Sequence, residues 1–324
     1  MVNRRTKAET FNAQTAKKIR FLAGLVVVLA LIYAGTLIFE PERVNTRNAS
    51  FVWLDAKWQD QADRIEISQA PEDTLSLTRQ NNTWFVSRDG VEYPAKQARI
   101  DDFLRILTTR GSYPVRGAEA ASHERLGLTE NTASRVIIRG GASTYPLLDL
   151  LIGNEDLTGS EIYLRKNNQN EVRSGQNTFS PYISGPVTAW LNLRLFPEPD
   201  EEVQRITVLA PVVEEALILA RQAGGWTIDG NVAINTQRIE SYIRSILDAE
   251  GEDFIPTLKP ADPVFNEGRI VLEFGNGTTR TISLGPSLES NQRSAAVSGG
   301  AFVYALAEWT VERIFRDRTY FEQQ

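Results

Sequence analysis

The chain has 324 residues, of which 42% are hydrophobic and 23% charged, and its formal net charge at pH 7 is −6. This composition is typical of a folded protein, and the length favours two domains. The sequence has no cysteine and one histidine, His123, which excludes disulfides, thiolate metal sites and metal sites built from several histidines. The negative charge argues against nucleic acid as a partner.

The N-terminal region predicts a membrane anchor. Residues 21–39 contain no charged side chain, and as a helix they would be about 28 Å long, close to the ~30 Å hydrocarbon core of a bilayer. Residues 1–20 carry six basic side chains and one acidic one, which predicts a cytoplasmic tail. We therefore expect one transmembrane signal anchor, then a polar stalk at 40–50 and a periplasmic bulk. A cleaved signal peptide and a buried helix are the alternatives.

The remaining sequence repeats one pattern. Trp84 and Trp226 each lie in a strand-like run that ends in an Asp-Gly turn pair. A helical pattern follows each run, with apolar residues on one face at Ile100, Phe103, Leu104 and Leu107 and, 139 residues later, at Ile239, Tyr242, Ile243 and Ile246. A third match, W-x-x-x-R-[LI]-F, begins at Trp190 and Trp309 and is expected on a short closing helix. These ordered matches predict two homologous repeats.

The fold class follows from the balance of elements in each repeat. Strand-like runs outnumber helical ones and are separated by short turns, which favours an α+β fold of mainly antiparallel sheet with packed helices. An acidic stretch containing proline, 197–202, marks the predicted boundary between the units. We therefore expect a first unit over 51–199 and a second over 200–324.

Searches for chemistry return no catalytic motif. A phosphate-binding loop, a serine-hydrolase elbow and a zinc-protease helix are all absent from the sequence. Gly275-Asn276-Gly277 is expected to be a hairpin turn, and His123 a solvated surface residue. Asp101 and Asp102 fit a solvated helix face better than an acid-base pair, because the second repeat has Glu240 and Ser241 there. We predict no catalytic, cofactor-binding or metal-binding residue, no cofactor, and solvated linkers for the acidic runs 198–202 and 248–253.

The tryptophans suggest a choice between core and surface. Trp84, Trp190, Trp226 and Trp309 recur at matching places among apolar neighbours, which favours core packing over a carbohydrate-binding surface. Trp53 and Trp58 lie outside the repeat, and could either anchor at the membrane interface or cover the first core.

Several short motifs resemble a bacterial family. They are D-R-I-E-I (63–67), N-T-W-F-V (82–86), R-I-x-x-F-L (99–104), E-R-L-G-L (124–128), L-L-I-G (150–153) and L-R-L-F (193–196). They resemble the domain of unknown function numbered 4340. Its members are often encoded beside an ABC-2-type exporter and an auxiliary protein like those of gliding-motility transporters. The resemblance therefore implies an envelope accessory protein and carries over no catalytic residue. The second repeat lacks a clear Leu-Gly-Leu element.

Together these observations predict a single-pass protein of the bacterial inner membrane that is not an enzyme. We expect an accessory or scaffold subunit associated with an ABC-type transport complex, with the membrane and other envelope subunits as partners. The alternative is a periplasmic module that binds a glycan or peptide in the groove between the repeats. A carboxylate-based hydrolase is the third possibility.

Overall fold

The computed structural model describes residues 24–31, 33, 49–69, 73–141, 143–197, 202–211 and 215–322. Contacts divide the chain into two compact units, Met1–Arg79 with Asp101–Gly185 and Gln80–Ile100 with Pro186–Gln324. The predicted tail at 1–20, most of the predicted stalk and the predicted boundary at 199–200 lie outside the described residues.

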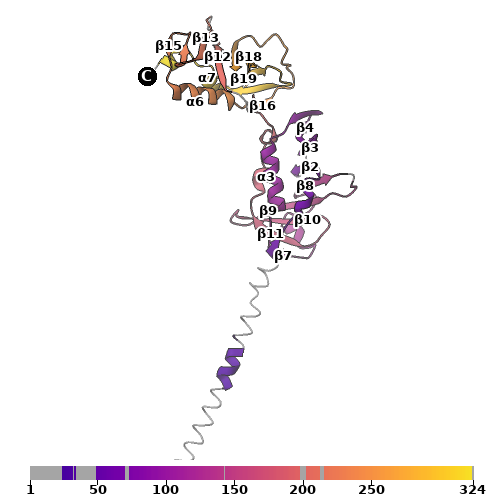
Figure 1. Cartoon of the computed structure of the whole chain (residues 1–324). Helices are drawn as coiled ribbons and strands as arrows, with labels where there is room; N and C mark the ends of the chain where they lie inside the picture. Colours follow the sequence, from indigo (N-terminus) through magenta and orange to yellow (C-terminus); the bar gives the residue numbers. More distant parts are fainter. Residues whose placement is uncertain are drawn as a thin grey trace, which may run out of the picture. The chain divides into compact units, whose positions relative to one another are not determined.

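Nine strands form the first sheet, in the order β5-β4-β3-β2-β8-β9-β10-β11-β7 (Figure 1). In that order they span Val91–Pro94, Thr83–Arg88, Asp73–Gln80, Ala62–Gln69, Ser134–Gly140, Leu148–Glu155, Glu161–Lys166, Val172–Gln176 and Val115–Gly117. In the antiparallel centre of the sheet, Ile65 on β2 lies opposite Leu77 and Ile138. All three side chains are buried, so the alternating apolar residues of these strands form the core.

Short elements accompany the first sheet. Strands β1 (Ser50–Phe51) and β6 (Gly111–Ser112) form a separate antiparallel pair. The helices and helical turns are η1 (Ala56–Trp58), α3 (Gln97–Thr108), α4 (Ser122–Arg125), α5 (Ser180–Ile183) and η2 (Val187–Trp190).

A second sheet of nine strands has the order β15-β14-β13-β12-β17-β18-β19-β20-β16. In that order the strands span Val232–Ala233, Gly225–Ile228, Leu217–Gln222, Val203–Leu209, Gly268–Phe274, Thr279–Leu288, Gln292–Val297, Val303–Ala307 and Asp253–Phe254. Helices α6 (Thr236–Leu247), α7 (Glu308–Ile314) and α8 (Arg318–Glu322) complete this part of the chain. The α+β class with mostly antiparallel sheet is confirmed.

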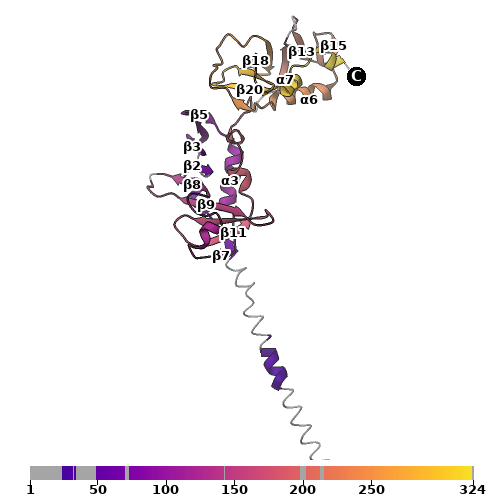
Figure 2. The ribbon, with the colours of Figure 1, turned by 180° about the vertical axis from the view of Figure 1, so that it is seen from behind.

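Matched in chain order, the two sheets have the same topology. Each begins with four consecutive strands and a long helix, α3 or α6, followed by a short strand that ends at the far edge of its sheet and by four more strands. Figure 2 shows α3 and α6 from behind, each beside the strands of its own sheet. The predicted Asp-Gly turns are present, since Asp89, Gly90, Asp229 and Gly230 all have positive φ.

The long helices bury the same face with one exception. Ile100, Phe103, Leu104 and Leu107 on α3 are buried, as are Ile239, Tyr242 and Ile246 on α6. Ile243, the counterpart of Leu104, is only partly buried, so the apolar face predicted from the sequence is not fully covered at this position. Arg105 and Arg244, each one position beyond an apolar residue of that face, are exposed.

Helix α5 in the first part of the chain and helix α8 in the second make the same contact with the long helix of their own sheet. Phe103 on α3 contacts Tyr182 on α5 with ring centroids 5.2 Å apart, and Tyr242 on α6 contacts Phe321 on α8 at 5.0 Å. Both residues of the second pair lie 139 positions after their counterparts. Helix α7 lies between β20 and α8 and has no counterpart between β11 and α5.

Helix α7 overturns the predicted W-x-x-x-R-[LI]-F match. Trp190 is the last residue of η2, after the closing helix α5, whereas Trp309 lies in α7, before the closing helix α8. The two tryptophans therefore occupy different places in the topology, and their shared spacing to Arg194 and Arg313 is coincidental.

Only part of the predicted membrane span is described. Residues 24–31 and 33 are helical, and the other positions of 21–39 lie outside the described residues. Within the described part of the chain, no helix combines the length and apolar character needed to cross a bilayer.

Candidate functional site

The acidic residues considered for acid-base work lie on the surface. Asp101 and Asp102 on α3 and Glu240 on α6 are exposed. Asp102 accepts a hydrogen bond from Arg105 Nη2 at 2.8 Å, one helical turn away. Across the described ranges, no group of three or more histidine, aspartate or glutamate side chains could hold a metal ion. The geometry on α3 is that of a surface ion pair.

His123 is buried, and the prediction of a solvated histidine is wrong. Its side chain on α4 is only 8% exposed, and Nε2 lies 3.0 Å from the carbonyl oxygen of Asn170 in the β10–β11 turn. The polar residues around His123 in the sequence gave no sign of this turn, which lies 47 positions further along the chain. The imidazole thus joins the segment between β7 and β8 to the turn between β10 and β11.

The Leu-Gly-Leu element, residues 126–128, packs closely against β9 because two glycines leave room for the contact. A Cβ on Gly153 would lie 2.3 Å from the carbonyl oxygen of Leu126, and one on Gly127, whose φ is +67°, would lie 2.4 Å from Asn154 Oδ1. The backbone N–H of Asn154 also donates to the Leu126 carbonyl at 2.9 Å. Leu128 anchors a small core cluster with Ala133, Leu151 and Val172. The element therefore serves packing.

The second unit makes an equivalent contact with a different residue. A Cβ on Gly285 of β18 would lie 2.8 Å from the ring of Phe265, as one on Gly153 would lie 2.9 Å from Leu128. Phe265 forms a cluster with Ala296 and Val303. The sequence does not reveal that Phe265 corresponds to Leu128, because Phe265 has no neighbouring glycine and the second unit has no Leu-Gly-Leu motif.

A buried arginine holds the loops beside this element. Arg165 donates from Nη2 to the Leu128 carbonyl at 2.9 Å and from Nη1 to the carbonyls of Asn167 and Gln169 at 3.0 and 2.9 Å. Burial lowers the pKa of its guanidinium. Since all three acceptors are backbone oxygens, Arg165 is a structural clamp.

Asp149 forms a second polar anchor nearby. Its two oxygens accept from Arg135 Nε and Nη2 at 2.8 and 2.7 Å, and Asn167 Nδ2 donates to it at 3.1 Å. Burial alone would raise the pKa of Asp149, but the hydrogen bonds from Arg135 and Asn167 outweigh it and lower the pKa.

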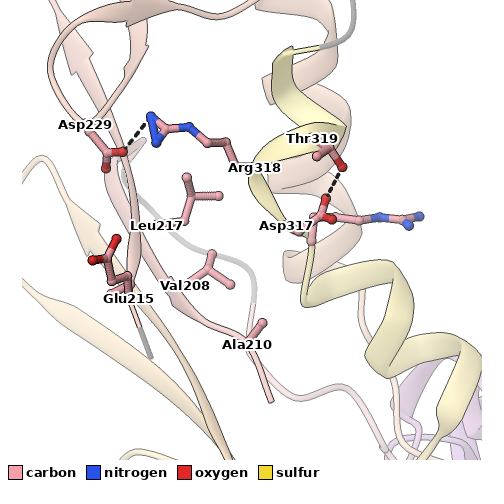
Figure 3. A pocket seen from close by; sticks show the side chains of 10 residues that line it. Val208, Ala210, Glu215, Leu217, Asp229, Asp317, Arg318 and Thr319 are labelled. Atoms are coloured by element: carbon pink, nitrogen blue, oxygen red, sulfur yellow. Dashed lines mark hydrogen bonds and ion pairs between the residues drawn. The ribbon is translucent and has the colours of Figure 1, made fainter. Parts of the chain in front are cut away.

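A cavity of about 270 Å³ opens in the second unit between β12, the start of β13 and α8 (Figure 3). On one wall Arg318 Nη2 pairs with Asp229 Oδ2 at 2.9 Å. On the other, Asp317 Oδ1 accepts from Thr319 Oγ1 at 2.8 Å and from the backbone N–H of Tyr320 at 3.1 Å, so it caps α8. These two carboxylates hold the local structure together.

A larger groove of about 430 Å³ lies beside α6 in the same unit. Its apolar lining includes Trp226, Ile243 and Leu247, and its charged lining is Glu202, Arg221, Glu240 and Arg244. Arg221 and Glu202 form an ion pair. The groove explains why Ile243 is less buried than Leu104, and it suits an apolar side chain flanked by charges of both signs.

The tryptophans divide between core and surface. Trp84 and Trp190 are 1% exposed and Trp226 is 7% exposed, so core packing is confirmed for these three. Trp309 is 59% exposed, with the Arg313 guanidinium 5.0 Å from its ring centroid, so core packing is wrong for this residue. Trp53 is buried and packs edge-on against Tyr113 with centroids 5.3 Å apart, and it therefore covers the first core.

The acidic run 248–253 is not a linker, although Asp248, Glu250 and Glu252 are solvent-exposed as predicted. Within the second compact unit, Asp248 pairs with Arg194 at 2.6 Å, and Asp253 pairs with Arg88 at 2.8 Å. Of the other acidic run, 198–202, only Glu202 is described. The predicted hairpin at Gly275-Asn276-Gly277 is confirmed between β17 and β18, with Gly277 at φ +79°.

Comparisons with known proteins give one finding. Curated proteins and solved structures provided no match. One family model does match, and its 184 residues are more than half of the chain. The model is Domain of unknown function (DUF4340), it matches residues 84–267, and the chain belongs to this family.

Proposed function

We propose that this protein is a single-pass, membrane-anchored envelope protein whose bulk lies in the periplasm of a bacterium. The carrying observation is the exposure of the helical residues near the N-terminus, where seven large apolar or aromatic side chains from Leu25 to Tyr33 are 48–67% exposed. Residues 25–29 are consecutive and span more than one helical turn, so exposed apolar side chains point to every side of this stretch. A helix that is apolar on all sides requires lipid or a protein interior around it.

The basic residues 1–20 support a cytoplasmic N-terminus. A reporter that is active only in the periplasm should be active when fused after Gln324 and silent when fused after Arg20. A matched fusion after Gly275, in the β17–β18 turn, should behave like the one after Gln324. The reverse pattern would refute the proposed orientation.

We infer further that the two sheets are homologous repeats. The shared strand order and the equal spacing of the Phe103–Tyr182 and Tyr242–Phe321 contacts support a duplication. Helix α7 is then an insertion of the second copy, and the Leu-Gly-Leu sequence a feature of the first. A duplicated unit with two separate modifications is suited to a scaffold whose two copies meet different partners.

The proposed role is that of a non-catalytic accessory or scaffold subunit of an ABC-type transport complex. The family resemblance implies this setting, and the polar groups around the Leu-Gly-Leu element, which serve internal contacts, are compatible with it. The test is recovery of the tagged full chain in mild detergent at native expression, with an unrelated single-pass protein as control. Co-purification of transporter subunits is expected. A monomer that recovers none of them would contradict the proposal.

A ligand-binding role is the second candidate, and Trp309 favours it. An exposed indole beside a guanidinium is a surface on which a sugar ring can stack. The groove beside α6 could then take a peptide side chain. The full chain would be titrated with envelope glycan fragments and peptides. Trp309→Ala should weaken glycan binding, whereas Tyr145→Ala, which removes an even more exposed ring from the first unit, should not.

A further inference from the structure

Two cations lie close to the ring of Phe51, the last residue of β1. The Arg173 guanidinium lies 4.1 Å from the ring centroid of Phe51, and Lys166 Nζ lies 5.6 Å from it. Trp53 packs edge-on against the same ring with centroids 4.9 Å apart. Two cations on one aromatic ring, on strands β10 and β11, form an unusual concentration of positive charge.

One more arginine extends this group. Arg110 Nη1 donates to Ser50 Oγ at 3.4 Å, and Ser50 precedes Phe51 on β1. We call Phe51, Arg110, Lys166 and Arg173 the Phe51 patch. Lys166 and Arg173 lie on β10 and β11, near the edge strand β7 of the first sheet (Figure 1).

The charge of the Phe51 patch is only partly compensated. Glu171 pairs with Arg173 at 2.6 Å, and Arg173 Nη1 also donates to the Tyr113 carbonyl at 2.8 Å. Within the described ranges Lys166 forms no ion pair, and Arg110 has only the Ser50 hydroxyl. Burial and the neighbouring Arg173 charge lower the pKa of Lys166, which means that an anion at this point would relieve an existing repulsion.

The position of the patch along the chain connects it to the proposed anchor. Residues 40–48 separate the predicted span from Ala49 and Ser50, and nine residues reach at most about 30 Å even when extended. The chain as a whole is acidic, with a net charge of −6, so this basic group is a local exception. Aromatic and basic side chains are also the residues that favour the membrane–water interface.

We propose that the Phe51 patch binds the phosphate groups of anionic phospholipids in the leaflet that faces it. This inference rests on the proposed membrane anchor. The bound headgroups would fix the orientation of the first unit on the membrane, because Lys166 and Arg173 lie on strands of the first sheet and not on the connecting segment.

The experiment uses the full chain in nanodiscs made of zwitterionic lipid alone or with one third anionic lipid. The readout is the rate at which a small amine-reactive compound labels the Lys166 side chain. The exposed Lys259 of the second unit is the internal control. Co-elution with the nanodisc tests the anchor separately: if the chain does not incorporate, the proposed anchor fails, and the inference that rests on it fails with it.

In anionic nanodiscs we expect labelling of Lys166 to slow by about threefold or more and to recover in about 0.5 M salt, where screening shortens the range of the charges. Arg110→Glu should reduce this protection, and the matched Arg244→Glu in the second unit should not. Equal labelling in both lipids, with the chain incorporated, would overturn the inference. Protection by inorganic phosphate in zwitterionic nanodiscs would also overturn it, since the source of the anion would be a free ion.

Discussion

Truncating the two matched helix residues Leu104 and Ile243 should have unequal effects. Leu104 on α3 is 3% exposed in the first core, whereas Ile243 on α6 is partly exposed and borders a cavity of about 430 Å³. Leu104→Ala should therefore cost about 3 kcal/mol of local stability, in the range usual for a buried leucine. Ile243→Ala removes side-chain atoms that are already partly in water, and should cost about 1 kcal/mol.

Hydrogen exchange of the full chain in detergent measures both effects locally. Peptides covering 97–108 and 236–247 report the opening free energies of α3 and α6 separately. Arg105→Ala and Arg244→Ala, each one position further along its helix, are the controls and should leave exchange unchanged because both side chains are exposed. Equal losses at Leu104 and Ile243 would refute the reasoning, since burial would then not determine the difference between the copies.

Three further predictions concern stability. Gly153→Ala should cost about 2–4 kcal/mol in urea unfolding, because its Cβ would lie 2.3 Å from the Leu126 carbonyl oxygen; a loss below about 1 kcal/mol would show that the loop can move away. Asp149→Asn should cost about 1 kcal/mol near neutral pH, and this difference from wild type should shrink between about pH 5 and pH 2. The reason is that the pKa of Asp149 is lowered by folding, so its contribution is present above the unfolded value and is lost as the carboxylate becomes protonated; a difference that is independent of pH would contradict it. Trp309→Ala should change the unfolding free energy by less than about 0.5 kcal/mol, whereas Trp190→Ala should cost about 3–5 kcal/mol, and similar values for the two would refute the assignment of surface and core.

The regular features of the fold could be predicted from the sequence. Helical periodicity predicts the buried face of α3, because its apolar residues repeat at the spacing that places them on one side of a helix. The Asp-Gly pairs identified the turns after β4 and β14, since a two-residue hairpin turn needs residues that accept positive φ. Both signals are local, and each needs only a few neighbouring residues.

The errors arose where burial depends on distant residues. His123 lies among polar neighbours in the sequence, yet its imidazole is buried and contacts the Asn170 carbonyl in the β10–β11 turn. The helical face of α6 predicted burial of Ile243, but periodicity does not indicate whether anything packs above that face. Trp309 and Trp190 share the same spacing to the following arginine and phenylalanine in the sequence. Trp309 lies on helix α7, which has no counterpart in the first repeat, so this spacing does not place the two residues at equivalent positions.

The difference between repeated and unrepeated features guides the search for function. Gly153 and Gly285 are repeated, and each allows a close packing contact, so their conservation of place between the units reflects the needs of the fold. Trp309, which is 59% exposed, and Lys166 of the Phe51 patch, which forms no ion pair within the described ranges, occur in one unit each. Mutations at repeated positions should therefore disturb folding first, whereas mutations at these two places should alter binding while the chain stays folded. An assay that compares both classes separates the scaffold from the surfaces that the scaffold presents.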